Sequence, residues 1–385
     1  MSNQAITIDD LRQSALRRLP RFLGEYVERG AGNGGGVRRN IEAFDKYVFL
    51  PRGLMPVASV DTSRSLFGRT YALGFGISAV GGVGIFRRNG VEMLAEAARE
   101  ANIPFMLSGL STASIEKVAR LAPDHIWSQL YAAKDTAITA RMVRRAHDAG
   151  VKVLVVTVDF PVPNRSEVTA RSGVTLTSGP GWRTAPSVLW DVFRHPAWAW
   201  EYARGGGSPT FESWQPYAGA SSNAADVAAF VAGMWPATLA WSDLEEIRRL
   251  WPGRLIVKGL VHIADILHAA NLGIDGVIVS SHGGNKLDCM AASIDLLAQA
   301  APFVSDRISL LFDGGIRRGS DMLKAIALGA EFCFVGRATL YGVVAGSKTG
   351  AERAIDIIRD EAAYVQAMIG CPKLDDVSRA MLYAS

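Results

Sequence analysis

From residue 71 onward, short runs rich in β-branched residues alternate with segments of helical period, and this alternation constrains the fold more than any other feature. Apolar runs such as VKVLVVTVD and GVIVSSH are typical of strands buried on both faces of a parallel sheet. Eight such runs predict an α/β fold, a closed TIM (β/α)8 barrel. The expected strands are Tyr71–Ala79, Ile103–Gly109, His125–Tyr131, Val151–Asp159, Arg254–Leu260, Gly276–His282, Ile308–Gly315 and Glu331–Ala338. The expected helices are Gly90–Asn102, Ser114–Leu121, Asp135–His147, Ser242–Trp251, Ile263–Asn271, Ala291–Ala301 and Gly319–Leu328.

Two segments fall outside this alternation. Residues 1–70 form an N-terminal extension, in which we expect a helix ending near Gly30, an element from Val37 to Lys46 and a strand pair from Val48 onward. We expect this extension to close the floor of the barrel. An insertion, residues 162–240, follows the fourth strand and is far longer than an ordinary βα loop. The sequence therefore predicts one barrel domain that spans residues 1–385.

The insertion is rich in tryptophan. Three interpretations stay open for it: a lid over the active-site mouth, an amphipathic patch at a membrane interface, and packing on the barrel. Charges of both signs occur in the segment, which weakens the membrane interpretation because no polybasic face accompanies the aromatic residues. The tryptophans concerned are Trp182, Trp190, Trp198, Trp200 and Trp214.

Polar residues end several of the expected strands. In barrels of this type the active site lies at the carboxyl ends of the strands, so these residues are functional candidates. They are Gln129 and Tyr131 on the third strand, Thr157 and Asp159 on the fourth, Lys258 on the fifth, and Ser280 and His282 on the sixth.

His282 is the strongest catalytic candidate. Of the six histidines, it alone follows a strand end beside glycines, in SSHGGNKLD. A carboxylate from Asp159, on a nearby strand end, would fix the imidazole tautomer and stabilise its charged form. We therefore predict that His282 is a general base. Because no histidine or cysteine pair has metal-ligand spacing, we expect no metal.

The last two strands predict a phosphate site. The seventh runs into DGGIRRG, which holds Gly315 and Arg317, and the eighth ends at Gly336 and Arg337. Glycines let the backbone approach a phosphate, the helix that begins near Gly319 offers free N–H groups, and arginines pair with phosphate in a bidentate manner.

Composition limits the partners and the location. The chain carries 41 Lys+Arg against 37 Asp+Glu, a net charge of +4, and no basic block gathers this charge, so we expect no nucleic-acid partner. The N-terminal residues lack the apolar run of a signal peptide, and no stretch reaches the roughly 18 apolar residues of a membrane span. We expect a cytoplasmic enzyme, with peripheral contact to the inner face of the membrane as an open alternative.

Together these motifs resemble the FMN-dependent α-hydroxy-acid oxidase and dehydrogenase family, which includes glycolate oxidase, lactate oxidase and mandelate dehydrogenase. The resemblance covers nearly the whole chain, from LRRLPRFLGEYVERGA through WSQLY, VTVDFP, DGVIVSSHGG and FDGGIRRGSDMLKAIALGA to VGRATLYG and IGCP. Details such as WPGRLIVKG, LDC and GRATLYG are most similar to the mandelate dehydrogenase branch, some members of which bind membranes through the segment that matches this insertion.

The resemblance implies roles for the candidates. His282 would act as general base while two electrons pass to N5 of FMN, and Asp159 would support the imidazolium. Tyr26 and Tyr131 would hydrogen-bond the substrate, and Lys258 would stabilise negative charge on the reduced flavin. The residues implied to hold the cofactor are Ala79, Val80, Gly81, Ser108, Gln129, Thr157, Lys258, Ser280, Asp313, Gly315, Arg317, Gly336 and Arg337.

Several positions depart from the family pattern, and those that concern the substrate are the most informative. An arginine normally follows the catalytic histidine by three residues and pairs with the substrate carboxylate, but this chain has Asn285. A second arginine is displaced to Arg165, with Ser166 in its usual place. An amide lacks the charge and the five donors of a guanidinium. We therefore expect a 2-hydroxy acid or an uncharged derivative, such as a hydroxy lactone, ester or amide. Leu110 stands where several relatives carry Trp and predicts a roomy substrate pocket.

Several alternatives remain at this stage. Arg165 or Lys286 is a possible source of the missing charge. Oxidation of a C–N bond next to a carbonyl is a second candidate reaction, and a non-redox phosphate-binding barrel is a third. No motif distinguishes O2 from a quinone as the electron acceptor. The resemblance also implies a homotetramer.

Overall fold

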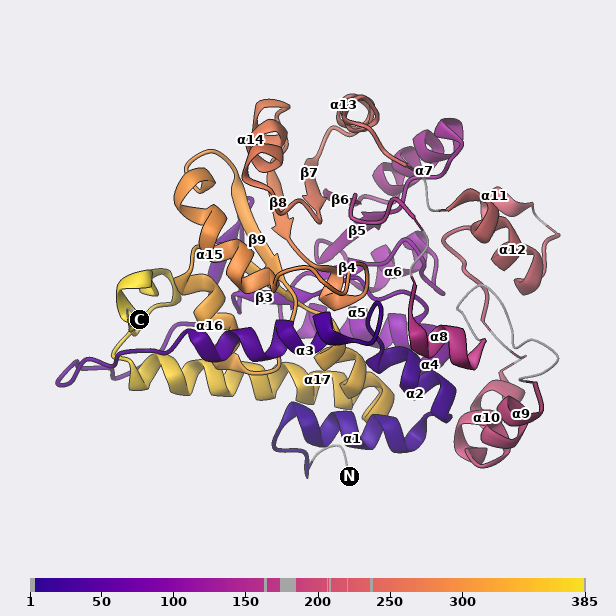
Figure 1. Cartoon of the computed structure of the whole chain (residues 1–385), viewed down its shortest axis with the longest axis horizontal. Coiled ribbons are helices and arrows are strands. Elements are labelled where there is room, and N and C mark those ends of the chain that lie inside the picture. The colour runs from indigo at the N-terminus through magenta and orange to yellow at the C-terminus, as the bar shows by residue number, and fades with distance from the viewer. Residues whose placement is uncertain are drawn as a thin grey trace.

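A closed barrel of parallel strands forms the centre of the molecule. The structure is a computed structural model that describes residues 4–162, 165–173, 185–205, 207, 209–219, 221–235 and 238–383. Within these residues, eight parallel strands pair in the order β10-β3-β4-β5-β6-β7-β8-β9, and β10 returns to β3 (Figure 1). The predicted TIM barrel is confirmed. The strands are β3 (Phe75–Ile77), β4 (Phe105–Leu107), β5 (Ile126–Leu130), β6 (Val153–Thr157), β7 (Arg254–Lys258), β8 (Gly276–Val279), β9 (Ser309–Asp313) and β10 (Phe332–Val335).

The first expected strand is two separate elements. The run Tyr71–Ala79 contains the end of β2 (Arg69–Tyr71), which pairs antiparallel with β1 (Arg64–Leu66), and then the barrel strand β3. The turn between β1 and β2 consists of Phe67 (φ 50°) and Gly68 (φ 81°), and two-residue hairpin turns of this kind require positive φ at both positions. The predicted strand pair therefore exists, but later in the chain than expected.

Helices surround the barrel, and the apolar period predicts most of them. They are α4 (Val83–Phe86), α5 (Gly90–Glu100), α6 (Ile115–Leu121), α7 (Thr136–Asp148), α13 (Trp241–Leu250), α14 (Ile263–Asn271), α15 (Ser293–Val304) and α16 (Gly319–Ala327). The sequence pattern does not predict the long C-terminal helix α17 (Arg337–Met368), which packs against α16, α5 and α1. The backbone of α17 departs from helical angles at Gly346 and Ser347. Short 3-10 turns follow at η4 (Leu374–Asp376) and η5 (Arg379–Met381).

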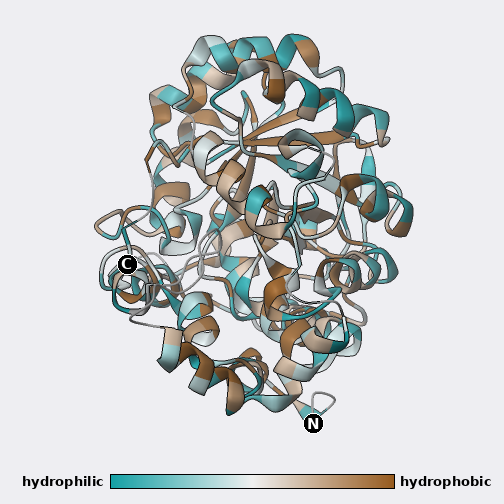
Figure 2. Ribbon diagram, turned by 90° about the vertical axis from the view of Figure 1, so that its right-hand side faces the viewer, coloured by the Kyte–Doolittle hydropathy of each residue, from teal (hydrophilic) through white to brown (hydrophobic). Residues whose placement is uncertain are grey.

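Large apolar side chains fill the barrel interior. Trp127 of β5 and Phe334 of β10 are each about 1% exposed, and their ring centroids lie 5.1 Å apart. Phe332 and Met106 belong to the same buried cluster. Figure 2 shows hydrophobic colouring along the central strands, whereas the surrounding helices carry both hydrophobic and hydrophilic residues. Among the described residues the barrel interior is thus a packed core, and a ligand site is expected at the ends of the strands.

The N-terminal extension begins with two helices instead of the one expected. These are α1 (Ile8–Arg18) and α2 (Arg21–Glu28). Pro20 separates them because proline has no N–H to donate and restricts the preceding residue to extended angles, as Leu19 shows (ψ 141°). The element expected from Val37 to Lys46 is α3 (Gly35–Glu42) followed by the 3-10 turn η2 (Ala43–Lys46).

The extension covers both ends of the barrel, so the expectation that it closes only the floor is corrected. Leu66 and Phe67 of the β1–β2 hairpin pack against Trp127 and Val153 near the strand starts. The α2–α3 loop lies at the opposite end, where the N–H of Ala31 donates to the carbonyl of Gly284 just after His282 (2.9 Å). Helices α2 and α3 therefore lie over the end that holds the candidate site.

The insertion divides into a packed part and an exposed part. Its helices are α8 (Glu167–Ser172), α9 (Ala185–Phe193), α10 (Pro196–Arg204), α11 (Gln215–Ala218) and α12 (Ala224–Met234). Trp214 is 1% exposed, and its indole N–H donates to the carbonyl of Gly109 (2.8 Å), so this part packs on the barrel. Trp190 and Trp200 are 62% and 60% exposed. Trp182 lies outside the described residues. In the described part of the chain, no helix has both the length and the apolar character needed to cross a membrane.

Candidate active site

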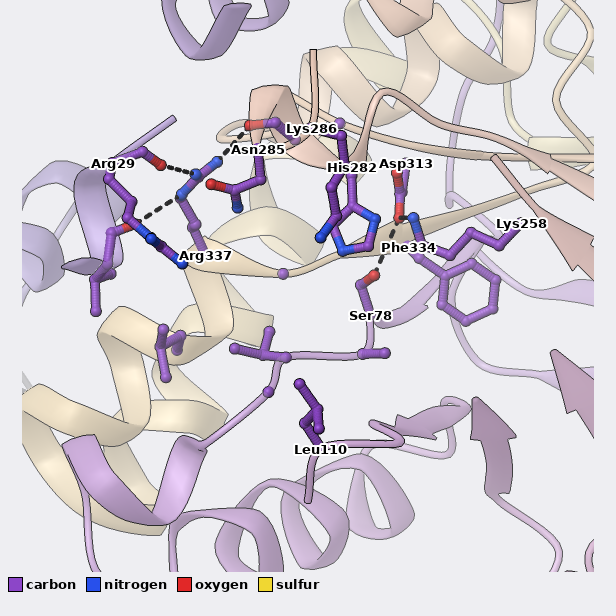
Figure 3. A pocket seen from close by; sticks show the side chains of 18 of the residues that line it. Arg29, Ser78, Leu110, Lys258, His282, Asn285, Lys286, Asp313, Phe334 and Arg337 are labelled. Atoms are coloured by element: carbon purple, nitrogen blue, oxygen red, sulfur yellow. Dashed lines mark hydrogen bonds and ion pairs between the residues drawn. The ribbon is translucent and has the colours of Figure 1, made fainter. Parts of the chain in front are cut away.

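Side chains from several strand ends surround one cavity at the carboxyl end of the barrel. Its volume is about 430 Å³, within the range of small-molecule sites. In Figure 3, Arg29, Arg337 and Asn285 lie to one side of His282, and Lys258 and Asp313 lie to the other. The remaining lining residues come from the β3 and β4 ends, from α2, from the β9 and β10 loops and from the insertion: Tyr26, Ser78, Ala79, Val80, Gly81, Leu110, Tyr131, Phe160, Thr169, Ala232, Trp235, Lys286, Gly315, Arg317 and Gly336, among others.

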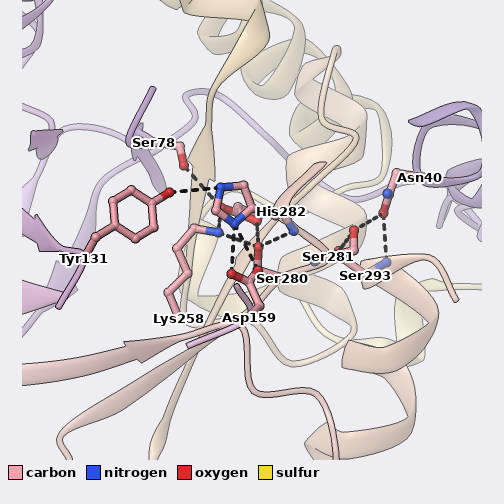
Figure 4. Close-up of polar contacts among 10 residues, drawn as sticks. Asn40, Ser78, Tyr131, Asp159, Lys258, Ser280, Ser281, His282 and Ser293 are labelled. Atoms are coloured by element: carbon pink, nitrogen blue, oxygen red, sulfur yellow. Dashed lines mark hydrogen bonds and ion pairs between the residues drawn. The ribbon is translucent and has the colours of Figure 1, made fainter. Parts of the chain in front are cut away.

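The imidazole of His282 lies between Asp159 and Tyr131 (Figure 4). Its Nδ1 is 3.0 Å from Oδ1 and 3.1 Å from Oδ2 of Asp159, and its Nε2 is 3.3 Å from the hydroxyl oxygen of Tyr131. The backbone N–H of His282 donates to Oγ of Ser280 (2.9 Å). Gly259 (φ 102°) is needed behind this pair, because a Cβ there would lie 2.5 Å from Cβ of Asp159. The geometry is that of a base with an orienting carboxylate.

Burial and neighbouring charges set the protonation of the pair. Burial lowers the pKa of His282 to about 4; the Asp159 carboxylate opposes this shift, whereas the charges of Lys286 and Lys258 add to it. Burial alone would raise the pKa of Asp159, but the charge of His282 and its hydrogen bond outweigh burial and lower that pKa to about 2. At neutral pH the imidazole is therefore neutral and donates its Nδ1–H to the carboxylate. The lone pair of Nε2 is then available for a proton.

A buried chain of polar groups lies beside His282. Nζ of Lys258 donates to Oγ of Ser280 (2.5 Å) and lies 2.9 Å from Oδ2 of Asp313. The hydroxyl of Ser280 donates to the other oxygen of Asp313, and the hydroxyl of Ser78 donates to Oδ2 (3.2 Å). Lys258 is only 3% exposed, so the carboxylate supplies the counter-charge that a buried ammonium needs. The chain fixes one positive charge at the ends of β7, β8 and β9.

Two tyrosines, Tyr26 and Tyr131, line the cavity together with His282. Burial raises the pKa of both Tyr26 and Tyr131, so both hydroxyls keep their protons and remain donors at physiological pH. The guanidinium of Arg29 stacks on the ring of Tyr26, 3.7 Å from its centroid, and also donates to Oγ1 of Thr169. Arg29 thus reaches the cavity from the end of α2.

Comparison with known proteins identifies the class. A family model described as FMN-dependent dehydrogenase matches residues 15–384. The chain belongs to the FMN-dependent dehydrogenase family. As a member of that family it is an FMN-dependent oxidoreductase that acts on 2-hydroxy acids.

Relatives of this family resemble the chain over almost its full length. L-lactate dehydrogenase of Caulobacter vibrioides strain NA1000 is 35% identical over 373 residues, covering 97% of this chain and 96% of that protein. L-lactate dehydrogenase of Xanthobacter autotrophicus is 34% identical, covering 97% and 95%. The crystal structure of the monotopic membrane protein (S)-mandelate dehydrogenase has a TM-score of 0.93 at 32% identity and covers 99% of this chain and 100% of its own. An arginine-to-leucine variant of mandelate oxidase with 2-hydroxy-phenylacetamide has a TM-score of 0.83 at 27% identity, covering 99% of both chains.

The residues at the strand ends fit FMN, the cofactor of the FMN-dependent dehydrogenase family. Nε2 of Gln129 and Oγ1 of Thr157 are buried and have no hydrogen-bond partner among the described residues, as expected of groups that serve a polar ligand. Ser108 lies close to Gly81, whose Cβ position is 3.6 Å from its Oγ. Ser108, Gln129, Thr157 and Ser280 are buried at the strand ends, behind the residues that line the cavity.

Two arginines lie where the phosphate is expected. Both Arg317 and Arg337 line the cavity. Burial, together with the charge of Arg317, lowers the pKa of Arg337 to about 10, so Arg337 remains charged at neutral pH. Arg337 also has a structural role: it donates to the carbonyls of Val27 (3.0 Å), Arg29 (2.8 Å) and Gly283 (2.8 Å). It therefore joins the end of α2 to the loop that carries His282.

The substrate-side departures from the FMN-dependent dehydrogenase pattern lie in different places. Asn285 lines the cavity, and its Oδ1 is buried without a partner in the described part of the chain. Arg165 is exposed and is not a lining residue, so the structure does not bring this predicted substrate ligand to the site. Ser166 is buried against the α2–α3 loop, where it bridges Gly32. Leu110 lines the cavity as expected.

Sequence reasoning missed part of the site. Ser78, Arg29, Phe160 and Trp235 line the cavity, yet no motif singled them out. Ser78 directly follows β3, so the rule that applied to the other strand ends would have found it. Arg29 and Trp235 enter from outside the βα units, and only the folded chain brings them to the site.

Proposed function

We propose that His282 is the general base in the oxidation of a 2-hydroxy carbonyl compound to the 2-oxo compound. Conversion of a secondary alcohol to a ketone removes two electrons and two protons. When bound, FMN accepts the two electrons and one of the protons. Nε2 of His282 receives the other proton. The observation that carries the proposal is the neutral imidazole held at 3.0 Å by Asp159 with Nε2 turned toward the Tyr131 hydroxyl at the cavity.

The neighbouring groups have complementary tasks in this proposal. Tyr131 and Tyr26 donate hydrogen bonds to the oxygens of the substrate, because burial keeps both hydroxyls protonated. Asp159 stabilises the imidazolium once Nε2 has taken the proton. Lys258, fixed by Asp313, supplies positive charge where the reduced cofactor gains negative charge.

The substrate we propose is a 2-hydroxy acid with a bulky apolar group, or its uncharged derivative. Leu110, Phe160 and Trp235 make part of the cavity apolar, and Phe160 and Trp235 stack at 4.2 Å between centroids. Asn285 occupies the place of the expected arginine, and Arg165 does not reach the cavity, so an amide or ester is a reasonable substrate beside the acid. The mandelate oxidase variant with 2-hydroxy-phenylacetamide, whose substituted residue is also an arginine, supports this breadth.

Anaerobic mixing of the purified holoenzyme with matched substrates tests the proposal. Mandelate, mandelamide, methyl mandelate and lactate should bleach the flavin absorbance near 450 nm to different extents, and His282→Gln should abolish bleaching by all of them while leaving the oxidised flavin spectrum unchanged. If 2-amino analogues bleach the flavin and the hydroxy compounds do not, the reaction is C–N oxidation instead. If no compound bleaches it, the proposed function is wrong.

We also propose that α9 and α10 contact a membrane surface. Leu189, Trp190, Phe193 and Trp200 are 60–73% exposed on these helices. Arg204 is exposed and lies over the ring of Trp200 (4.6 Å to the centroid), which suits an interface with acidic headgroups.

The opposite face of the helix pair is anchored to the body of the protein. Glu201 pairs with Arg18 (2.5 Å) and Arg87 (3.1 Å), and the hydroxyl of Tyr202 donates to the carbonyl of Gly84 (2.5 Å). The apolar residues are thus presented on a fixed support.

Flotation with vesicles that contain phosphatidylglycerol tests the membrane contact. The double variant Trp190→Ser/Phe193→Ser should lose binding, whereas Phe303→Ser, which removes an equally exposed residue (63%) from α15, should keep it. Equal flotation of all three proteins would contradict the proposal.

A further inference from the structure

Among the described residues, one cation that lines the active-site cavity has neither a counter-ion nor a hydrogen-bond partner. Lys258 is paired with Asp313, and the three arginines all donate hydrogen bonds: Arg337 to three backbone carbonyls, Arg29 to Thr169 and Arg317 to the carbonyl of Ile316 (2.9 Å). The ammonium of Lys286, by contrast, forms no ion pair within 4.0 Å and no hydrogen bond in the described part of the chain. Its contacts are with the faces of two aromatic rings, Phe160 at 3.0 Å and Trp235 at 5.6 Å from the ring centroids.

The position of Lys286 places this free charge where a substrate would lie. The residue follows His282 by four positions on the same loop, and both line the cavity. Its neighbour Asn285 also lines the cavity and has a buried amide oxygen without a partner among the described residues. Because Phe160 stacks on Trp235, the aromatic pair fixes the ammonium at little cost in side-chain entropy.

We infer that Lys286 binds the carboxylate of the 2-hydroxy acid and thereby decides whether the enzyme prefers the acid or its uncharged derivative. The inference rests on the proposed function and deepens it. Lys286 supplies the charge that Asn285 lacks, but as a point charge on a flexible stem instead of a fixed guanidinium fork. The consequence is a site whose preference between acid and amide depends on whether this one amine is protonated.

Charged groups around Lys286 make that protonation sensitive to pH. Burial lowers the pKa of Lys286 to about 7; the carboxylate of Asp159, which follows β6, opposes the shift, and Arg29 of α2 and Lys258 of β7 add to it. His282 on the same loop is already neutral at this pH, because its own pKa is about 4. Between pH 6 and pH 9, Lys286 therefore loses its charge while the base stays in its active form.

The kinetic test compares (S)-mandelate with (S)-mandelamide on the holoenzyme from pH 6 to pH 9. In the wild type, the ratio of kcat/KM for the acid to that for the amide should fall as the pH rises through the pKa of Lys286. Lys286→Met should lower kcat/KM for the acid by about 10- to 100-fold and that for the amide by less than about 3-fold, since a hydrogen bond to a charged group has this strength. Lys286→Arg should keep turnover of the acid and remove the pH dependence of the ratio.

A binding measurement gives a second readout without turnover. Phenylacetate and phenylacetamide, which lack the hydroxyl group, are titrated against the flavin spectrum, and only the acid should bind more weakly to Lys286→Met. The matched control is Lys152→Met, which removes an exposed lysine paired with Asp124 just before β6, at the other end of the barrel. If Lys286→Met loses the same affinity for phenylacetate and phenylacetamide, or loses affinity for neither, the inference is overturned. Failure of every compound to bleach the wild-type flavin would instead refute the proposed function.

Discussion

Replacement of Asp159 by asparagine removes the negative charge from the proposed catalytic pair of Asp159 and His282. The size of the side chain at position 159 is nearly preserved. The carboxylate oxygens lie 3.0 and 3.1 Å from Nδ1 of His282, so the centres of the two delocalised charges are about 4 Å apart once Nε2 has taken a proton. At an effective dielectric constant of about 20, unit charges at that separation attract by about 4 kcal/mol. Since each 1.36 kcal/mol is tenfold in rate, kcat for Asp159→Asn should fall by about 10²- to 10³-fold.

The assay separates this effect from substrate binding. Asp159 does not line the cavity, and binding of the uncharged (S)-mandelamide does not depend on the charge of Lys286. The dissociation constant of this substrate should therefore change by less than about 3-fold when anaerobic flavin reduction is followed over a range of its concentrations. Asp159→Glu keeps a carboxylate and should retain more activity than the asparagine variant. Because the pKa of Asp159 is about 2, the wild-type carboxylate stays ionised from pH 5 to pH 9. The ratio of wild-type kcat to the kcat of Asp159→Asn should therefore be constant over that range. A kcat for Asp159→Asn within tenfold of the wild type would refute the reasoning.

Three further results are expected. Asn40→Ala should lower the free energy of unfolding in urea by about 2–4 kcal/mol, because the buried Oδ1 of Asn40 accepts from the backbone N–H of Ser293 (2.9 Å) and the hydroxyl of Ser281 (3.0 Å). Asn40→Asp should not restore this stability, because the amide of Asn40 also donates to the carbonyl of Gly36 (2.8 Å) and a buried carboxylate would oppose that carbonyl. Gly259→Ala should reduce kcat strongly with little change in flavin content, since the new Cβ would displace Asp159; normal turnover would contradict the packing argument. Lys286→Met should raise the free energy of unfolding at pH 7 by roughly 1–3 kcal/mol. The pKa of Lys286 in the folded protein (about 7) lies below the ordinary lysine value of 10.5, so burial of its charge destabilises the fold fully below pH 7. The stability gained by Lys286→Met should therefore vanish toward pH 10.5.

The barrel and the pairing of Asp159 with His282 were predictable because their sequence signals are local. Each buried strand is a continuous apolar run, and the rule that active sites lie at strand ends then brings Asp159 and His282 together although 123 residues separate them. The same rule placed Lys258 and Asp313 correctly at the site. The first expected strand combined β2 and β3 because no polar residue separates these two strands in the sequence.

Features that depend on contacts between distant segments were not predictable. Arg165 and Lys286 were equivalent sources of charge in the sequence, but only Lys286 reaches the cavity. The chain direction at α8 decides this, since Ser166 bridges Gly32 and leaves the Arg165 side chain exposed. The sequence likewise predicted that Arg337 lies at a strand end, but it did not predict the hydrogen bonds of Arg337 to the carbonyls at the end of α2.

The bonds between Arg337 and the end of α2 have a consequence for biosynthesis. Arg29 and Arg337 are 308 positions apart, and α1 packs along the C-terminal helix α17. Helices α1 and α2 therefore cannot reach these contacts until translation has passed Arg337 and α17. Because the cover of the active site is translated before the residue that anchors it, premature termination just before Arg337 should yield a chain with all eight barrel strands but an open catalytic end.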